Sequence, residues 1–181
     1  NIYKQLKSLF SSSADDNLDP SFLQYKSELS APEMGRVMVL GARSQIGHFL
    51  IPRLINAGYP VSAASRKKVK SSDISDLEWC ELDLKSEGEL DLPDGTTTVI
   101  SLAPVWLLAG RINEMCDMGV LRIFFFSSMS RFTYLVSSNA AECNLALRLA
   151  ESDDRIIEEC QKRGIHWTLF RPTLVYGCGM D

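Results

Sequence analysis

The sequence lacks the features that define several specialised classes of protein. No apolar run approaches the ~18 residues that a membrane-spanning helix needs. The weakly amphipathic start is followed by Ser11 and Asp15 rather than by the apolar core of a secretory signal. Basic residues cluster only at Arg66, Lys67 and Lys68, which is too short a run for a nucleic-acid footprint. We therefore expect neither a membrane nor a nucleic-acid partner.

Metal-binding patterns are also absent. The cysteines show no CxxC or other metal-ligand spacing, and His48 and His166 share none. An odd number of cysteines without a secretory signal predicts reduced thiols in a cytoplasmic protein, most of them small core residues. We expect no metal site. The five cysteines are Cys80, Cys116, Cys143, Cys160 and Cys178.

The composition is that of an ordinary globular domain. The chain has 181 residues, of which 45% are hydrophobic and 23% charged, with a net charge of −4. A chain of this length buries about 70% of its unfolded surface on folding. We interpret residues 1–33 as an appended N-terminal arm with short helical pieces, and residues 34–181 as one domain.

From Arg36 onward, short apolar runs alternate with amphipathic helical windows, which is typical of βαβ units on a parallel sheet. Right-handed crossovers then predict a Rossmann-type doubly wound α/β fold with strand order 3-2-1-4-5-6. Ligands in such sheets bind beyond the carboxyl ends of the strands. The expected strands are 36–40, 60–64, 77–82, 97–102, 121–126 and 166–170, and the expected helices are 45–57, 105–118 and 140–163.

The turn after the first strand carries the clearest chemical pattern. Gly41 suits a tight turn, and Gly47 lets the following helix pack close to the strand. Ser44, Gln45 and Ile46 open that helix, whose free amides favour a pyrophosphate. We interpret residues 41–47 as a cofactor-binding loop, with an ordinary β-turn-helix as the alternative.

The end of the second strand indicates which cofactor. An acidic residue there would bind the ribose 2′-hydroxyl of NAD, but the chain has Ser65 and Arg66. Arg66, with Arg43 from the glycine loop, is suited to a 2′-phosphate. We expect NADP, with NAD as the open alternative. Two solvated surface arginines are the simpler interpretation.

Several motifs in order resemble the extended short-chain dehydrogenase/reductase superfamily. The six-residue spacing from Gly41 to Gly47 equals that of its G-x-x-G-x-x-G loop, although Ser44 replaces the middle glycine. The segment 127–130 matches its Ser-Ser-x-[Ser/Thr] pattern. The run from Arg171 to Gly177 resembles the R-P-x-x-[VI]-Y-G run of nucleotide-sugar epimerases and dehydratases. The chain thus resembles the cofactor-binding part of the NAD-dependent epimerase/dehydratase family.

This resemblance implies roles for further residues. It implies that Asp83 and Leu84 contact the adenine, and that Leu102, Ala103 and Pro104 line the nicotinamide-side ribose. Ser127 would contact the cofactor, and Ser128 would polarise a substrate oxygen. The substrate would be a small molecule, in this family a nucleotide sugar, and a substrate-binding portion would follow Asp181.

One departure puts catalysis in doubt. The family uses a Tyr-x-x-x-Lys pair as acid/base and ribose ligand, but counting back from Arg171 puts that pair at Ala146 and Ala150. If this register is right, both alanines face the cofactor cleft. Tyr134 and Arg148 are candidate substitutes, with a loop aromatic and a solvated helix charge as the simpler interpretations.

The function therefore stays open between two classes. The first is an NADP-binding oxidoreductase or epimerase with impaired or atypical catalysis. The second is a non-catalytic NADP-binding sensor or scaffold. A homo-oligomer is left open. We interpret the acidic residues of the long helix as a solvated face; they are Glu151, Asp153, Asp154, Glu158 and Glu159.

Overall fold

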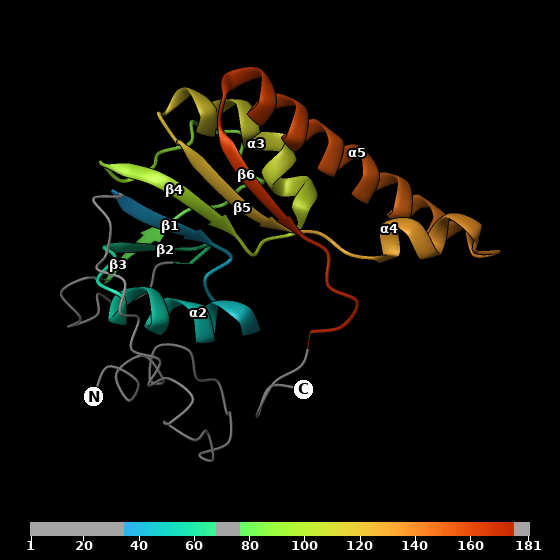
Figure 1. The fold of residues 1–181 in the computed structure, drawn as a ribbon, viewed down its shortest axis with the longest axis horizontal. Coiled ribbons are helices and arrows are strands. Elements are labelled where there is room, and N and C mark those ends of the chain that lie inside the picture. Colours follow the sequence, from blue (N-terminus) through green and yellow to red (C-terminus); the bar gives the residue numbers. More distant parts are fainter. Residues whose placement is uncertain (1–34, 68–76, 176–181) are drawn as a thin grey trace, which may run out of the picture.

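Six parallel strands form one sheet in the computed structural model, which describes residues 35–67 and 77–175. The strand order is β3-β2-β1-β4-β5-β6, as predicted (Figure 1). All five strand pairs are parallel. The strands are β1 (Arg36–Leu40), β2 (Val61–Ser65), β3 (Leu77–Glu81), β4 (Thr96–Ser101), β5 (Arg122–Phe126) and β6 (His166–Phe170).

Helices lie on both faces of the sheet. α2 (Gln45–Asn56) covers one face, and α3 (Val105–Asp117) and α5 (Ala140–Arg163) cover the other (Figure 1). α5 begins at Asn139, whose side chain accepts a hydrogen bond from the Ala141 amide at 2.9 Å. It ends at Gly164, whose positive φ of 69° terminates the helix, as expected from the sequence.

The sheet separates two hydrophobic clusters. The larger one packs α3 and α5 against the sheet and includes Met38, Leu108, Ile112, Phe125 and Ile156, all fully buried. The smaller one packs α2 against β1 and β2, through side chains such as Ile51 and Val39. This two-sided core explains why β1, which contributes Met38 to the larger cluster and Val39 to the smaller, is apolar from Val37 to Leu40.

The apolar run of β5 is covered by the described helices on one face only. Ile123 and Phe125 are buried beneath α3 and α5, but Phe124 and Phe126 are only half-buried. Phe126 stacks on Phe170 with ring centroids 4.9 Å apart, and Phe170 is 45% exposed. Among the described helices, only α2 lies on that side, over β1 and β2.

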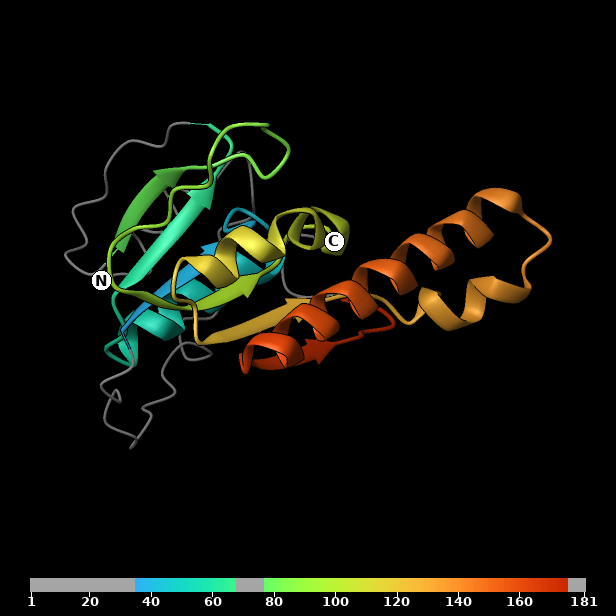
Figure 2. The same ribbon diagram turned by 90° about the horizontal axis from the view of Figure 1, so that it is seen from above.

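Two short elements were not predicted. The helix α4 (Ser130–Thr133) and the 3-10 helix η2 (Tyr134–Val136) connect β5 to α5. Together with the first turns of α5 they extend beyond the edge of the sheet (Figure 2). The segment is too short for hydrophobic periodicity to identify a helix. Its apolar residues Phe132, Leu135 and Val136 have the i, i+3, i+4 spacing of a helix, but all three are exposed. Its local structure instead depends on short contacts that hydrophobic patterning does not predict.

Four of the five cysteines lie in the described residues, whereas the proposed N-terminal arm does not. Cys80, Cys116, Cys143 and Cys160 are free thiols, and Cys160 lies in the larger hydrophobic cluster. The proposed arm 1–33, Cys178 and the Tyr176-Gly177 end of the family motif lie outside the described residues. The division into arm and domain therefore stays a prediction.

Candidate functional site

The glycine loop after β1 approaches the neighbouring strand closely. Gly41 has φ of +69°, and a Cβ there would lie 2.8 Å from the Ala103 amide nitrogen and 2.9 Å from the Leu102 carbonyl carbon. A Cβ at Gly47 would collide with the Ala42 carbonyl. Both glycines are therefore required by the backbone: the first for the turn, the second for packing α2 against β1.

Ser44 begins α2. Its hydroxyl oxygen accepts a hydrogen bond from the Gly47 amide at 3.2 Å, as an N-cap does. The hydroxyl proton is still available for an anion in front of the helix. The first turn contains no acidic residue, so the positive end of the helix dipole is not neutralised by its own side chains. Gln45 and Ile46 are half-buried in that turn.

A cleft of about 820 Å³ lies at the carboxyl ends of β1 to β4. This is the topological switch point of the sheet, where β1 pairs with β2 on one side and β4 on the other. The backbone closes behind it, since the Leu102 amide donates to the Leu40 carbonyl at 2.9 Å. Its lining includes nine of the predicted cofactor residues: Gly41, Arg43, Ser44, Arg66, Asp83, Leu84, Leu102, Ala103 and Pro104.

Four predicted cofactor residues do not line this cleft. Gln45, Ile46 and Gly47 lie in the first turn of α2, immediately beyond Ser44. Ser127 lies at the end of β5, with its amide donating to the Phe170 carbonyl at 2.8 Å. Its Oγ is buried without a hydrogen-bond partner among the described residues. The roles of these four residues stay predictions.

Four cationic side chains line the cleft. Lys67 and Lys85 line it together with Arg43 and Arg66, and all four are exposed. Neither lysine was predicted as a cofactor residue. The only carboxylate among the lining residues is Asp83, which accepts the Lys85 amide at 3.0 Å. The lining therefore carries four cations and one acid, which favours an anionic ligand.

The segment after β5 is arranged by its own hydroxyls. Ser128 Oγ accepts the Ser130 amide at 3.1 Å and is 3.0 Å from Ser130 Oγ. The Ser128 hydroxyl donates to Ser130 Oγ, so in this arrangement its oxygen can accept one further hydrogen bond but its proton is already used. Tyr134, the other candidate catalytic residue, lies in η2, and its carbonyl accepts from the Cys143 thiol at 3.4 Å. Tyr134 does not line the cleft.

The two alanines at the expected dyad positions differ in exposure. Ala146 is fully buried, and Ala150 is half-buried. Neither lines the cleft, whose walls come from β1 to β4, so the dyad register stays a prediction. The Arg148 guanidinium lies 4.2 Å from the centre of the Trp106 ring at the start of α3. Arg148 is therefore an exposed helix residue whose guanidinium also makes a cation–π contact.

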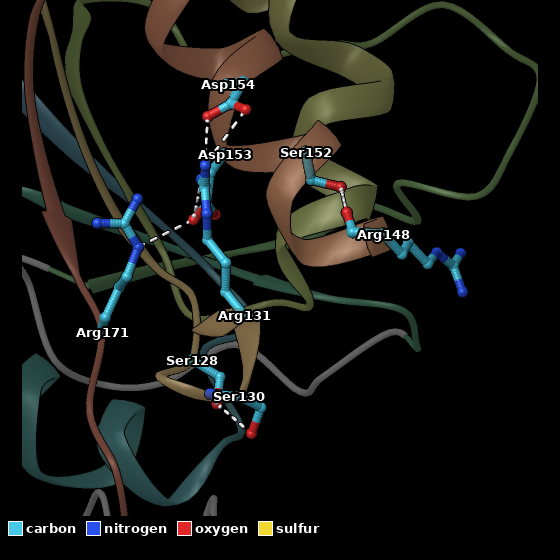
Figure 3. A network of polar contacts seen from close by, with 8 residues as sticks. All are labelled: Ser128, Ser130, Arg131, Arg148, Ser152, Asp153, Asp154 and Arg171. Carbon is cyan, nitrogen blue, oxygen red and sulfur yellow. Dashed lines mark hydrogen bonds and ion pairs between the residues drawn. The ribbon is translucent and has the colours of Figure 1, made fainter. Parts of the chain in front are cut away.

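One expectation about α5 is wrong. Asp153 is completely buried, not part of a solvated face. Its Oδ2 accepts hydrogen bonds from Arg131 Nη1 at 3.1 Å and Arg171 Nε at 3.0 Å (Figure 3). Helical periodicity could have predicted this burial, because position 153 falls on the same face of the helix as the buried Leu149 and Ile156. Arg131, in α4, and Arg171, which directly follows β6, supply the counter-charge.

Within residues 35–67 and 77–175, no group of three or more His, Cys, Asp or Glu side chains is placed to hold a metal ion. No helix in these ranges has the length and apolarity required to cross a bilayer.

The fold and the switch-point cleft together define a Rossmann-type α/β domain. Comparison with known families refines this class: residues 37–104 match the model of the NAD dependent epimerase/dehydratase family. The match runs from β1 to the end of the loop after β4 and confirms the family resemblance over the segment that forms the cleft. Comparison with curated proteins gave no match.

Solved structures agree on the fold. MoeE5 in complex with UDP-glucose and NAD is 20% identical with a TM-score of 0.62, covering 81% of this chain and 57% of that one. UDP-N-acetylglucosamine 4-epimerase from Bacillus cereus is 15% identical with a TM-score of 0.57, covering 75% and 59%. The Bordetella bronchiseptica enzyme WbmG in complex with NAD is 11% identical with a TM-score of 0.60, covering 79% and 54%. The chain thus spans less than two thirds of the length of these proteins.

Proposed function

We propose that this chain binds a nicotinamide dinucleotide in the switch-point cleft and prefers NADP to NAD. Its substrate would be a nucleotide sugar or a related carbinol. The observation that carries the proposal is the cleft itself. It combines a turn at Gly41 that leaves no room for a Cβ, a helix N-terminus whose positive dipole end has no acidic side chain beside it, and four cationic lining side chains. The bound nicotinamide would supply hydride chemistry, whereas the chain's own residues bind and orient.

Each part of a dinucleotide meets a matching group. The amides around Ser44 at the start of α2 suit the pyrophosphate. Leu84 supplies an apolar surface for the adenine, and Asp83 a polar edge. Arg66 and Arg43 suit a phosphate on the ribose. The neighbouring structures carry NAD, so the NADP preference rests on the four cations and on the absence of an acid at the end of β2.

Calorimetric titration tests this preference. We expect NADP to bind the wild-type chain at least tenfold more tightly than NAD. Arg66→Ala removes one charge-assisted pair, worth roughly 1.5–3 kcal/mol. Because Arg66 is exposed, water and salt weaken the pair, and we expect the lower end, about tenfold for NADP and no change for NAD.

A charge-matched control separates the pair from a general charge effect. Arg155→Ala removes an exposed arginine of α5 that does not line the cleft, and it should leave both affinities unchanged. Equal affinity of the wild-type chain for NADP and NAD would reject the preference. Failure of both to bind would reject the proposed function.

The missing dyad favours a second candidate, a non-catalytic NADP sensor or scaffold. Ala146 and Ala150 cannot transfer a proton, and Tyr134 lies away from the cleft lining. The two candidates differ in one measurement. Conversion of UDP-glucose or UDP-N-acetylglucosamine in the presence of NADP supports an enzyme, whereas binding of NADP without conversion of either compound supports a sensor. Conversion is followed by chromatography of the nucleotide sugars, because epimerisation and dehydration leave the cofactor unchanged overall and give no steady absorbance change at 340 nm.

A further inference from the structure

The carboxylate of Asp153 joins three parts of the chain that are far apart in sequence. Its Oδ2 accepts from Arg131, in the segment after β5, and from Arg171, in the segment after β6. Asp153 itself belongs to α5 and has no exposed surface. A buried charge is stable only when it is paired and hydrogen-bonded. The two arginines are therefore held to this one oxygen.

The two arginines also share a contact with one aromatic ring. The guanidinium carbons of Arg131 and Arg171 both lie 5.6 Å from the centre of the Phe132 ring. Burial lowers the pKa of Arg131, but hydrogen bonds to Asp153 and Asp154 raise it more, so the net direction is upward. The Asp154 side chain is 64% exposed, and its Oδ1 lies 2.9 Å from Arg131 Nη2. Two anions thus balance two cations, with Asp153 at the centre (Figure 3).

Backbone hydrogen bonds join the segment that holds Ser127 and Ser128 to the segment that holds Arg171. The Ser127 amide donates to the Phe170 carbonyl at 2.8 Å, and the Met129 amide to the Pro172 carbonyl at 3.3 Å. The segments after β5 and β6 therefore run side by side past the ends of their strands. Ser127 and Ser128 lie in the first of them. A shift between the two segments would move both hydroxyls.

We propose that Asp153 is a positioning residue: it fixes the segment after β5, with Ser127 and Ser128, against the segment after β6, and so holds the substrate end of the site. The cofactor cleft does not depend on it, because that cleft is formed by the ends of β1 to β4. The role of the serines rests on the proposed function, whereas the effect on the two segments does not.

Hydrogen exchange tests the structural half without any ligand. In Asp153→Asn we expect the hydrogen-bonded amides of the segment after β5, such as those of Ser127, Met129 and Phe132, to exchange at least tenfold faster than in the wild type. The amides of β1 and α2 should keep their protection. Asp154→Asn is the matched control, since it removes the exposed carboxylate on the same arginine, and it should change exchange in that segment by no more than about twofold. Equal acceleration in both variants, or acceleration throughout the chain, would overturn the proposal.

Ligand titrations test the functional half. In Asp153→Asn we expect the Kd for UDP-glucose to rise at least tenfold and the Kd for NADP to change less than twofold. Asp153→Glu, which keeps a carboxylate, should recover part of the loss. If Asp153→Asn does not fold, Arg171→Lys serves instead, because lysine keeps the charge but lacks the planar donor group.

The outcomes separate the two proposals. Equal weakening of NADP and UDP-glucose would show a general structural role and would overturn the positioning role. Failure of the wild-type chain to bind NADP would reject the proposed function, and the exchange experiment would still decide the role of Asp153 in holding the two segments.

Discussion

Replacing Gly41 by alanine perturbs the turn on which the cleft depends. At φ of +69° a residue with a Cβ costs about 1–2 kcal/mol. The new Cβ would also lie 2.8 Å from the Ala103 nitrogen and 2.9 Å from the Leu102 carbonyl carbon. Both are backbone atoms, so they cannot rotate away, and the resulting strain adds roughly 1–3 kcal/mol. We expect a total loss of about 2–5 kcal/mol.

Urea unfolding followed by tryptophan fluorescence measures this loss. Gly88→Ala is the matched control, because Gly88 has no positive φ and no atom within 4 Å of an added Cβ. It should change the free energy of unfolding by less than about 1 kcal/mol. The Gly41 variant that still folds should bind NADP at least tenfold more weakly, since the amides at the start of α2 move with the turn. If the two variants were equally stable and bound NADP equally well, the reasoning about the glycine loop would be refuted.

Three further predictions concern other parts of the chain. Gly110→Ala should raise the free energy of unfolding by roughly 0.5–1 kcal/mol in urea unfolding, because Gly110 lies inside α3 with open space around it; a lower stability would contradict this. Ala146→Tyr should lower stability by about 1–3 kcal/mol, since the site is fully buried, and an unchanged melting temperature would show that room exists. Burial raises the pKa of Cys160 to about 12 from 9.0, so unfolding exposes a thiol that ionises more easily. Wild-type stability should therefore fall relative to Cys160→Ala between pH 9 and 12, by about 1.4 kcal/mol per pH unit, and parallel pH curves would contradict this.

Much of the fold could be predicted because local and global patterns agree. The ranges of β1, α5 and β6 match the predicted ones, and the other strands and helices differ by a residue or two at their ends. Apolar runs flanked by glycine, such as β5 after Gly119, are unambiguous in a βαβ chain. The glycine loop was also predictable, because the residues that make it are adjacent in sequence.

Most of the missed features depend on contacts across the chain. Asp153 was assigned to solvent because acids on a helix are usually exposed, whereas its partners Arg131 and Arg171 lie 22 and 18 residues away. Lys67 and Lys85 both line the cleft because β2 and β3 are neighbouring strands that end side by side. The helix α4 is too short for hydrophobic periodicity to identify it. Contacts between residues far apart in the sequence explain the first two failures, and the shortness of α4 explains the third.

The central claim is that the cleft at the ends of β1 to β4 holds the dinucleotide. Mapping amide chemical shifts during an NADP titration tests it most directly. We expect saturable shifts for the amides of residues 41–47, for Arg66 and Lys67, and for Leu84. The amides of Glu159 and Cys160, far along α5, should not move. Saturable shifts confined to α5 and β6, or the absence of any saturable shift in residues 41–47, would contradict the account.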